Sequence, residues 1–294
     1  MKRLINRYPI IMIIVGVFGI SLSAIFVRLS DSPSALTAAW RLLWTVGLMS
    51  PIVFAKKSSR AELISIKPLS ALLCVLSGVF LAIHFVLWFE SLRHTTVASS
   101  TSIVATEVIW VSLGYCIFMR GKLSKKAVLC IVAAFAGSVL IAMSDFNAHS
   151  NMLYGDILAL LSAVAVAVYM LLGRKARETL TTTVYTYIVY SSCAILLVIV
   201  TFFQGLELFG FGYKVILVGL LLAVFSTILG HSIFSWCLKF FSPSFVSASK
   251  LCEPVVAAVI AAVLFKEFPG YLQIIGAIIV VGSVFFFSRE ERQA

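Results

Sequence analysis

Charged residues are scarce in this chain of 294 residues, because Asp, Glu, Lys and Arg together make up only 12% of it. Hydrophobic residues make up 61%, and the mean hydropathy is +1.08, values that exclude an ordinary soluble domain. No long Gly/Ser linker, low-complexity tract or block of like charges interrupts the chain. Any functional site must therefore be built from apolar segments and the short connections between them.

The motifs of several enzyme and pump classes are also missing. The chain contains no CxxC, HExxH, GxGD or P-loop sequence, so nothing indicates a zinc centre, an intramembrane protease or an ATP-driven pump. Its six cysteines lie within or at the edges of apolar segments, which favours packing roles over a disulfide scaffold. The sequence predicts neither an enzyme nor a cofactor or bound metal.

What the chain has instead is ten apolar stretches, each near the roughly 20 residues that a membrane-spanning helix needs. They are residues 9–29, 35–55, 68–92, 96–119, 124–143, 153–174, 183–203, 213–238, 244–265 and 268–288. We therefore expect an all-α integral membrane protein with ten transmembrane helices, surrounded by a lipid bilayer.

The net charge of +11 would suit a nucleic-acid partner, but the distribution of the basic residues points elsewhere. If the N-terminus is inside, 17 of the 23 Lys and Arg residues fall on the inner side of the ten predicted spans and four fall on the outer side. The four outer residues are Arg28, Arg93, Lys214 and Lys266. This asymmetry is the positive-inside signal. It predicts a multi-pass protein of the cytoplasmic (inner) membrane with both termini in the cytoplasm, and it explains the charge without nucleic acid.

The two halves of the chain repeat each other weakly. Glu107 and Glu253 lie mid-way along apolar stretches and are 146 residues apart, and the same offset relates Leu92 to Leu238. The interpretation is two five-helix repeats, residues 1–147 and 148–294. Because five crossings are an odd number, the second repeat must be inverted relative to the first. Inverted repeats with a polar midplane are typical of transporters that work by alternating access.

Several motifs resemble a known family. In the second half these motifs are Trp236–Ser244, Leu251–Ala258, Lys266-Glu267 and Gly276-Ala277. In the first half they are Ser91–Arg93, Val97–Ser100 and Ala136-Gly137. The segment Gly155–Ala163, together with Tyr169, resembles the opening of the second repeat. Together they resemble the EamA-type transporters of the drug/metabolite transporter superfamily. One departure is that Gly121 or Lys122 stands where the second repeat has Glu267.

This resemblance implies ten helices in an inverted five-plus-five arrangement, and often export. It also implies a central cavity lined by spans one to four and six to nine, with spans five and ten as peripheral supports. It implies no particular substrate, because the family carries amino acids, nucleosides, amines, vitamins and drugs.

Two carboxylates are candidates for the transport site. A charged side chain at mid-membrane costs about 2.5–3.5 kcal/mol on insertion scales, so Glu107 and Glu253 at matched positions suggest use. Either could bind a cationic group or a coupling proton. The structural alternatives are a hydrogen-bonded packing role for Glu107 and an ion pair of Glu253 with Lys250, three residues earlier.

Arg41 is the candidate for the opposite charge. It could hold a substrate carboxylate while Trp44, one turn along, stacks on the organic part of the substrate. The alternatives are a structural pair with an acidic residue on a neighbouring helix, or snorkelling to the outer surface.

Histidine and aromatic residues complete the candidate site. His84 and Trp88 are four residues apart on the third predicted span, and His231 lies on the eighth. An intramembrane histidine can relay protons or bind substrate, and it can equally be a packing residue. Trp110 continues a stripe with Glu107 along the fourth span, which indicates either a cavity wall or a helix interface. The full candidate set is Arg41, Trp44, His84, Trp88, Glu107, Trp110, Tyr169, His231 and Glu253.

The function expected from these observations is secondary transport of a small polar or amphipathic metabolite, such as an amino acid or an amine, in the export direction. The alternatives are a non-coupled channel or facilitator and, with less support, an intramembrane enzyme. A coupling proton is left open as a second partner. A monomer is expected because ten helices can enclose a complete pathway, with a dimer left open.

Overall fold

The computed structural model describes residues 9–28, 30–95, 97–144, 153–253, 255–256 and 271–293. Every regular element within these ranges is a helix. In chain order they are α2 (Pro9–Ser21), α3 (Ser23–Arg28), α4 (Ser34–Ala55), α5 (Lys57–Ile64), α6 (Pro68–His94), α7 (Val97–Val104), α8 (Glu107–Phe118), α9 (Lys125–Ser144), α10 (Leu153–Ala176), α11 (Thr182–Phe203), α12 (Gly212–Leu221), η1 (Leu222–His231), α13 (Ser232–Cys237), α14 (Pro243–Lys250) and α16 (Tyr271–Gln293).

Six helical segments are long and apolar enough to cross a membrane, which confirms the all-helical membrane class. They are Pro9–Val27, Ser34–Ala55, Pro68–His94, Leu153–Ala176, Thr182–Phe203 and Gly212–Cys237. Of the remaining expected spans, the fifth and the tenth correspond to the continuous helices α9 and α16, and the other two are less regular. The fourth is divided into α7 and α8 by a turn at Ala105–Thr106, and the ninth is described only as far as Val256. The count of ten crossings therefore stays a prediction.

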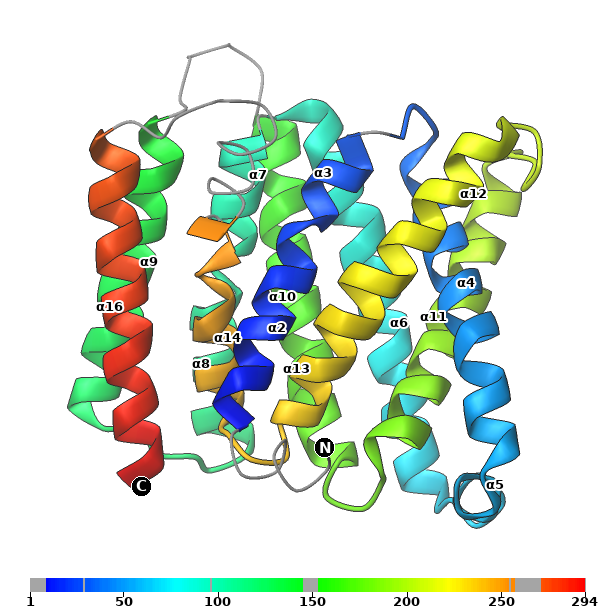
Figure 1. Cartoon of the computed structure of the whole chain (residues 1–294), viewed down its shortest axis with the longest axis horizontal. Helices are drawn as coiled ribbons and strands as arrows, with labels where there is room; N and C mark the ends of the chain where they lie inside the picture. Colours follow the sequence, from blue (N-terminus) through cyan, green and yellow to red (C-terminus); the bar gives the residue numbers. More distant parts are fainter. Residues whose placement is uncertain are drawn as a thin grey trace.

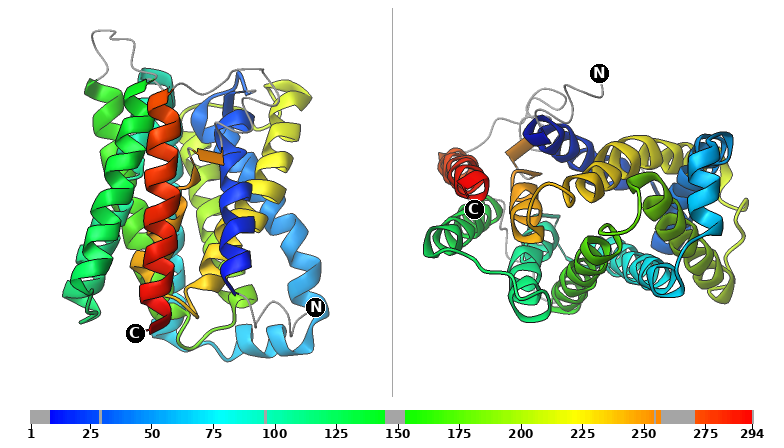
Figure 2. Two further views of the ribbon diagram at one scale, coloured as in Figure 1. Left: turned by 60° about the vertical axis from the view of Figure 1, so that its left-hand side comes forward. Right: turned by 90° about the horizontal axis from the view of Figure 1, so that it is seen from below.

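The long helices stand side by side along one common direction (Figures 1 and 2). α10 packs on α6, α11 packs on α4 and α6, and α2 packs on η1. α9 and α16 pack on each other at one side of the bundle, where the family resemblance places the fifth and tenth spans. The described chain begins at Pro9 and ends at Gln293, and both residues lie at the same end of the molecule. We call this the terminal end.

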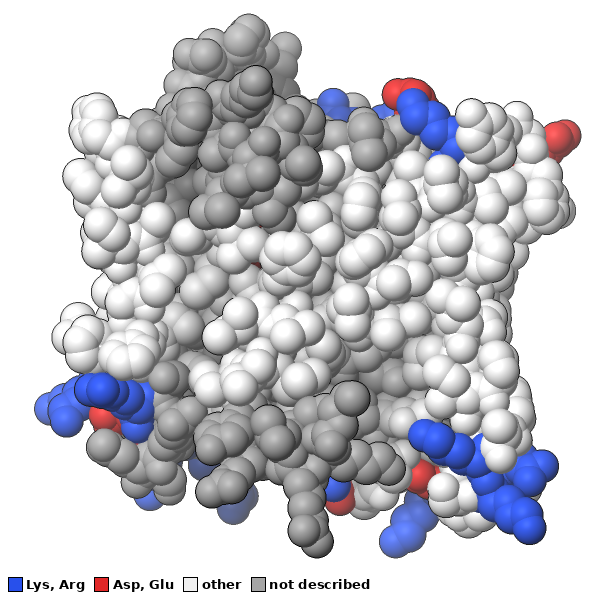
Figure 3. Space-filling model, in the orientation of Figure 1, with Lys and Arg blue, Asp and Glu red and all other residues white. Residues whose placement is uncertain are grey.

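Charge is concentrated at the ends of the helices. Figure 3 shows Lys and Arg gathered along the terminal end, whereas the middle of this face is almost free of charged atoms in its described part. The short helix α5 at that end carries Lys57 and Arg60. Large apolar side chains such as Ile14 and Phe18, exposed by 65% and 50%, face outward from α2. This arrangement suits a bilayer, where an apolar middle contacts lipid chains.

Two glycines allow neighbouring helices to approach closely. A Cβ atom on Gly19 of α2 would lie 2.6 Å from the carbonyl oxygen of Phe225 in η1. One on Gly78 of α6 would lie 2.5 Å from the carbonyl oxygen of Val189 in α11. Close packing over small residues is a main source of helix association in membranes. These contacts help to hold η1 and α6, which carry the site described below.

The replacement Gly19→Ala should therefore destabilise the protein by about 1–3 kcal/mol, because backbone atoms of η1 must move away from the new methyl group. Gly47→Ala on α4 is the matched control, since nothing lies within 4 Å of the position of its Cβ atom. Thermal unfolding of both purified variants in detergent measures the difference. Equal midpoints for the two variants would contradict the close approach of α2 and η1.

Candidate functional site

A group of polar and aromatic side chains from distant parts of the chain meets inside the bundle. We call it the central cluster, and it consists of Arg41, His84, Phe85, Trp88, Tyr169, Thr227 and His231. All seven side chains are buried. The ring of His231 is the common neighbour, with its centroid 6.5 Å from His84, 5.4 Å from Phe85 and 6.1 Å from Tyr169. The cluster therefore joins α4, α6, α10 and η1 at one place.

Arg41 is buried without an acidic partner. Its Nε donates to Thr227 Oγ1 at 2.7 Å, its Nη1 donates to Ser23 Oγ at 3.5 Å, and its guanidinium lies 4.2 Å from the centroid of Phe85. Within the described residues no carboxylate lies within 4.0 Å of Arg41. The side chain is only 1% exposed. Arg41 therefore does not extend to the surface, and it contacts no acidic side chain within the described residues.

Thr227 and His231 lie on an unusual helical segment. η1 is a π-helix of 10 residues inserted between α12 and α13. The wider winding is visible in side-chain bonds across five residues: Thr227 Oγ1 donates to the Leu222 carbonyl and Ser232 Oγ donates to the Thr227 carbonyl, each at 3.2 Å. π segments are rare and are often found at functional sites.

α6 and α10 hold the histidine side of the cluster. His84 Nδ1 lies 2.8 Å from Ser162 Oγ, and the His84 ring stacks on Trp88 with an interplanar angle of 13°. The hydroxyl groups of Tyr169 and Ser235 are 3.0 Å apart. The indole Nε1 of Trp88 is buried and has no hydrogen-bond acceptor among the described residues. An unpaired buried donor costs about 1–3 kcal/mol, so it marks a place where an acceptor is expected.

An ion pair lies next to the central cluster. Lys250 Nζ of α14 is 3.0 Å from Glu107 Oε1 of α8, with side-chain exposures of 11% and 7%. Ser247 Oγ donates to the same carboxylate oxygen at 3.0 Å. Lys250 also lies 3.4 Å from the sulfur of Met170. These contacts fix the charge of Glu107 inside the protein.

This pairing contradicts the structural alternative in which Lys250 pairs with Glu253. α14 ends at Lys250, and the turn at Leu251–Cys252 interrupts the regular helix that would place residues three apart on one face. The carbonyl oxygen of Glu253 accepts from Ser21 Oγ at 3.3 Å, whereas its carboxylate makes no ion pair within the described residues.

The structure brings five of the nine candidate residues into the central cluster, namely Arg41, His84, Trp88, Tyr169 and His231. The two other tryptophans lie elsewhere. Trp44 is half-buried and its Nε1 donates to the Ile216 carbonyl of α12 at 3.0 Å. Trp110 lies on α8 with Glu107, but it is 38% exposed whereas Glu107 is buried.

Sequence reasoning missed Phe85, Thr227 and Ser162. Each lies in an apolar run whose composition does not separate it from packing residues. In this part of the chain, the only useful sequence signal was the four-residue spacing of His84 and Trp88, which places both on one face of a helix.

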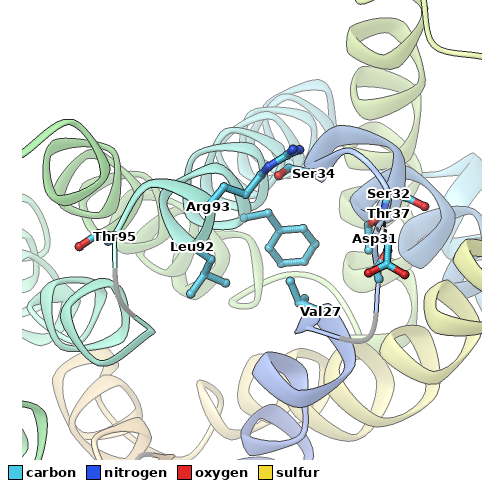
Figure 4. Close-up of a pocket in the computed structure, with 10 residues that line it drawn as sticks. Val27, Asp31, Ser32, Ser34, Thr37, Leu92, Arg93 and Thr95 are labelled. Atoms are coloured by element: carbon cyan, nitrogen blue, oxygen red, sulfur yellow. Dashed lines mark hydrogen bonds between the residues drawn. The ribbon is translucent and has the colours of Figure 1, made fainter. Parts of the chain in front are cut away.

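A cavity of about 510 Å³ opens at the end of the molecule opposite to the terminal end. We call it the outer cavity. It is lined by Val27, Ser30, Asp31, Ser32, Ser34, Thr37, Phe89, Leu92, Arg93 and Thr95. Figure 4 shows Arg93 extending toward the start of α4, near Ser34. Asp31 at the rim forms an ion pair with Lys214, whose Nζ lies 2.5 Å from Asp31 Oδ2.

The outer cavity leads toward the central cluster. Thr37 is four residues from Arg41 on α4, and Phe89 is four residues from Phe85 on α6. Residues four apart share one face of an α-helix and are about 6 Å apart along its axis. The deep side of the cavity is thus separated from the central cluster by one helical turn on both helices.

The comparison with protein families gives two matches that cover nearly the whole chain. The model of the EamA-like transporter family matches residues 7–143 and again residues 153–289. The chain belongs to this family. It is a membrane transporter with multiple membrane-spanning helices, and the two matches agree with a duplicated unit. The exact repeat boundaries at residues 147 and 148 stay a prediction.

Relatives of this EamA-family protein carry names that agree. An uncharacterized transporter of Archaeoglobus fulgidus is 24% identical over 268 residues, which cover 88% of this chain and 85% of that protein. An uncharacterized transporter of Bacillus subtilis is 26% identical over 205 residues, covering 69% of this chain and 65% of that protein. A solved crystal structure, 15% identical, superposes over 98% of this chain and 99% of its own with a TM-score of 0.81, and so has the same fold.

The buried ion pair generates a stability prediction. Glu107→Gln leaves Lys250 as an unpaired buried cation, which should cost about 3–5 kcal/mol. Thermal unfolding in detergent and the yield of monodisperse protein measure this loss.

The double variant Glu107→Gln/Lys250→Met is the control, because it removes both charges and should recover most of the lost stability. If Glu107→Gln is as stable as the unaltered protein, the pair has no structural role.

Proposed function

We propose that this EamA-family protein is a secondary transporter that moves a small polar or amphipathic metabolite across the cytoplasmic membrane by alternating access. The substrate binds at the central cluster, and the direction in the cell is export. The observation that carries the proposal is the position of the central cluster, which is buried and lies one helical turn along α4 and α6 from the residues that line the outer cavity.

Contacts at the terminal end support a closed inner side. The guanidinium of Arg174 donates to the carbonyls of Leu238 and Phe241, and Arg177 Nε donates to the Ser235 carbonyl at 3.3 Å. Burial lowers the pKa of Arg177 to about 10, so it remains charged at neutral pH. These two arginines tie the end of α10 to the end of α13 and the turn that follows it.

A second tie lies nearby. The carboxylate of Glu62 on α5 accepts from Thr181 N at 2.6 Å and from Thr181 Oγ1 at 2.7 Å, at the start of α11. A cavity at one end and hydrogen-bonded closure at the other are the features of an outward-facing carrier. Transport to the other side requires these ties to break while the outer cavity closes.

The proposed orientation has the terminal end in the cytoplasm. The concentration of Lys and Arg at this end supports it, because basic residues favour the cytoplasmic side. The protein works as a monomer in this proposal. Glu253 is the carboxyl group assigned to a coupling proton, because Glu107 is already held by Lys250 and Ser247.

Counterflow in proteoliposomes tests the transport mechanism. A thermal-shift screen of amino acids, amines, nucleosides and carboxylic acids first identifies a ligand, since binding to the native state raises the melting temperature. A carrier then accumulates labelled ligand transiently when the vesicles are preloaded with unlabelled ligand. A channel shows no such stimulation, and this result would overturn alternating access.

Trp88→Phe should reduce counterflow at least severalfold, because it removes the buried indole donor beside His84. Trp110→Phe is the matched control on the exposed surface of α8 and should leave counterflow unchanged. Equal effects of the two replacements would place the binding site outside the central cluster.

Glu253→Gln tests the proton. We expect counterflow to persist in this variant, while net transport no longer responds to an imposed pH gradient, because the amide cannot carry a proton. A variant that still follows the pH gradient would remove Glu253 from the coupling role and leave the carrier mechanism intact.

A further inference from the structure

We infer that the substrate of this transporter is an organic anion or zwitterion whose carboxylate binds Arg41, and that cationic amines are excluded. This inference rests on the proposed function and names the substrate class of the same site. It follows from three observations: the balance of charges, the surplus of hydrogen-bond donors and the shape of the route that leads inward.

Within the described residues, one buried cation beside the ion pair has no carboxylate in contact with it. Lys250 and Glu107 neutralise each other at 3.0 Å. Arg41 remains, fully buried and more than 4.0 Å from every described carboxylate, including that of Glu253. A buried cation is costly unless an anion lies beside it. Glu253 acts on Arg41 electrostatically but not through contact, and its carboxyl group is assigned to the coupling proton. The contacting anion that fits best is therefore one that the substrate supplies.

The donors of the cluster also exceed its acceptors. A guanidinium carries five N–H donors. The described contacts of Arg41 use Nε for Thr227 and Nη1 for Ser23, and no hydrogen bond involves Nη2 within the described residues. Trp88 Nε1 is a second buried donor without an acceptor there. A carboxylate is an acceptor-only group that matches the fork of an arginine, often with two parallel hydrogen bonds.

These donors lie on connected surfaces. The guanidinium of Arg41 lies over Phe85 at 4.2 Å, Phe85 is the neighbour of His84 on α6, and His84 stacks on Trp88. Trp88 in turn adjoins Phe89, which lines the outer cavity. A carboxylate at Arg41 would thus be the deepest part of the ligand, and an apolar remainder would lie along the aromatic side chains toward the outer cavity.

Recognition of an amine has no equivalent support. An ammonium group needs free acceptors of negative charge. Glu107 is held by Lys250 and Ser247, and Asp31 at the rim of the outer cavity pairs with Lys214. Glu253, which makes no ion pair within the described residues, is the carboxyl group already assigned to the coupling proton. A cation entering from the outer cavity would also meet the positive charges of Arg93 and Arg41 in turn. The site therefore discriminates by the sign of the head group.

A matched set of three ligands tests this inference on the full-length purified protein: 4-methylpentanoate, L-leucine and 3-methylbutylamine. They share a branched apolar tail and differ in the head group. Thermal shift and isothermal titration at fixed ionic strength should show binding of the carboxylate, of the zwitterion or of both, and none of the amine. Binding of the amine at equal strength, or silence of both carboxylate compounds, overturns the inference.

Variants of Arg41 assign the effect to this residue. Arg41→Gln should weaken carboxylate binding about 10- to 100-fold, the range expected for a hydrogen bond to a charged group. Arg41→Lys keeps the charge but loses the planar fork, and it should bind with intermediate strength. The double variant Glu107→Gln/Lys250→Met is the matched control: it neutralises the adjacent pair and should keep the preference for carboxylates. Unchanged carboxylate binding by a folded Arg41→Gln protein also overturns the inference.

The two proposals fail in different ways. Counterflow of the amine with none of the carboxylates would disprove the substrate class and leave the carrier mechanism in place. Arg41-dependent carboxylate binding without any counterflow would disprove the carrier mechanism and leave the binding site in place.

Discussion

The structure depends on how it accommodates the ionisable side chains that are buried inside a membrane-embedded bundle. Each charge must then find a partner inside the protein, because the surrounding hydrocarbon supplies none. Lys250 and Glu107 meet this demand by pairing across α14 and α8, with Ser247 as an additional donor. Arg41 meets it only partly, through two hydroxyl groups and the face of Phe85. In the proposed mechanism, this difference separates a structural charge from one that binds the substrate.

In the proposed mechanism, the surrounding helices let a substrate approach Arg41 from the outer cavity. α4 and α6 run from the outer cavity past the central cluster, and each contributes one residue to the cavity and another, one turn away, to the cluster. At the opposite end, Arg174 and Arg177 bind backbone carbonyls at the end of α13, where the last turn of a helix leaves carbonyls without partners. In the proposed mechanism, arginine side chains thus have two roles: Arg174 and Arg177 close the terminal end, and Arg41 binds the substrate in the central cluster. The groups around each arginine decide which role it has.

Much of the architecture could be predicted from the sequence, because hydropathy and the distribution of Lys and Arg respond directly to the bilayer. The membrane class and the membership of the EamA family are confirmed, and each described span is helical. The residues of the candidate site were harder to predict from the sequence. His84 and Trp88 could be found because their spacing places both on one helix face.

The partner of Lys250 could not be found from the sequence, because it depends on a turn at Leu251–Cys252 that no residue pattern announced. Trp110 and Glu107 were expected on one stripe; both lie on α8, yet Glu107 is buried and Trp110 is 38% exposed. The π winding of η1, which carries Thr227 to Arg41, had no visible sequence signal either. For Lys250 and for Thr227, the sequence analysis failed because it assumed an unbroken α-helix across the membrane.

Several contacts of the site join residues from opposite halves of the chain: Arg41 with Thr227, His84 with Ser162, and Glu107 with Lys250. This has a consequence for synthesis. The ribosome completes the first half before the partners in the second half exist, so Arg41 and Glu107 enter the membrane unpaired. Glu107 then carries an insertion cost of about 2.5–3.5 kcal/mol until Lys250 arrives. Folding of the interior must therefore wait for translation to pass residue 250, and a first half made alone would lack both Lys250 and Thr227.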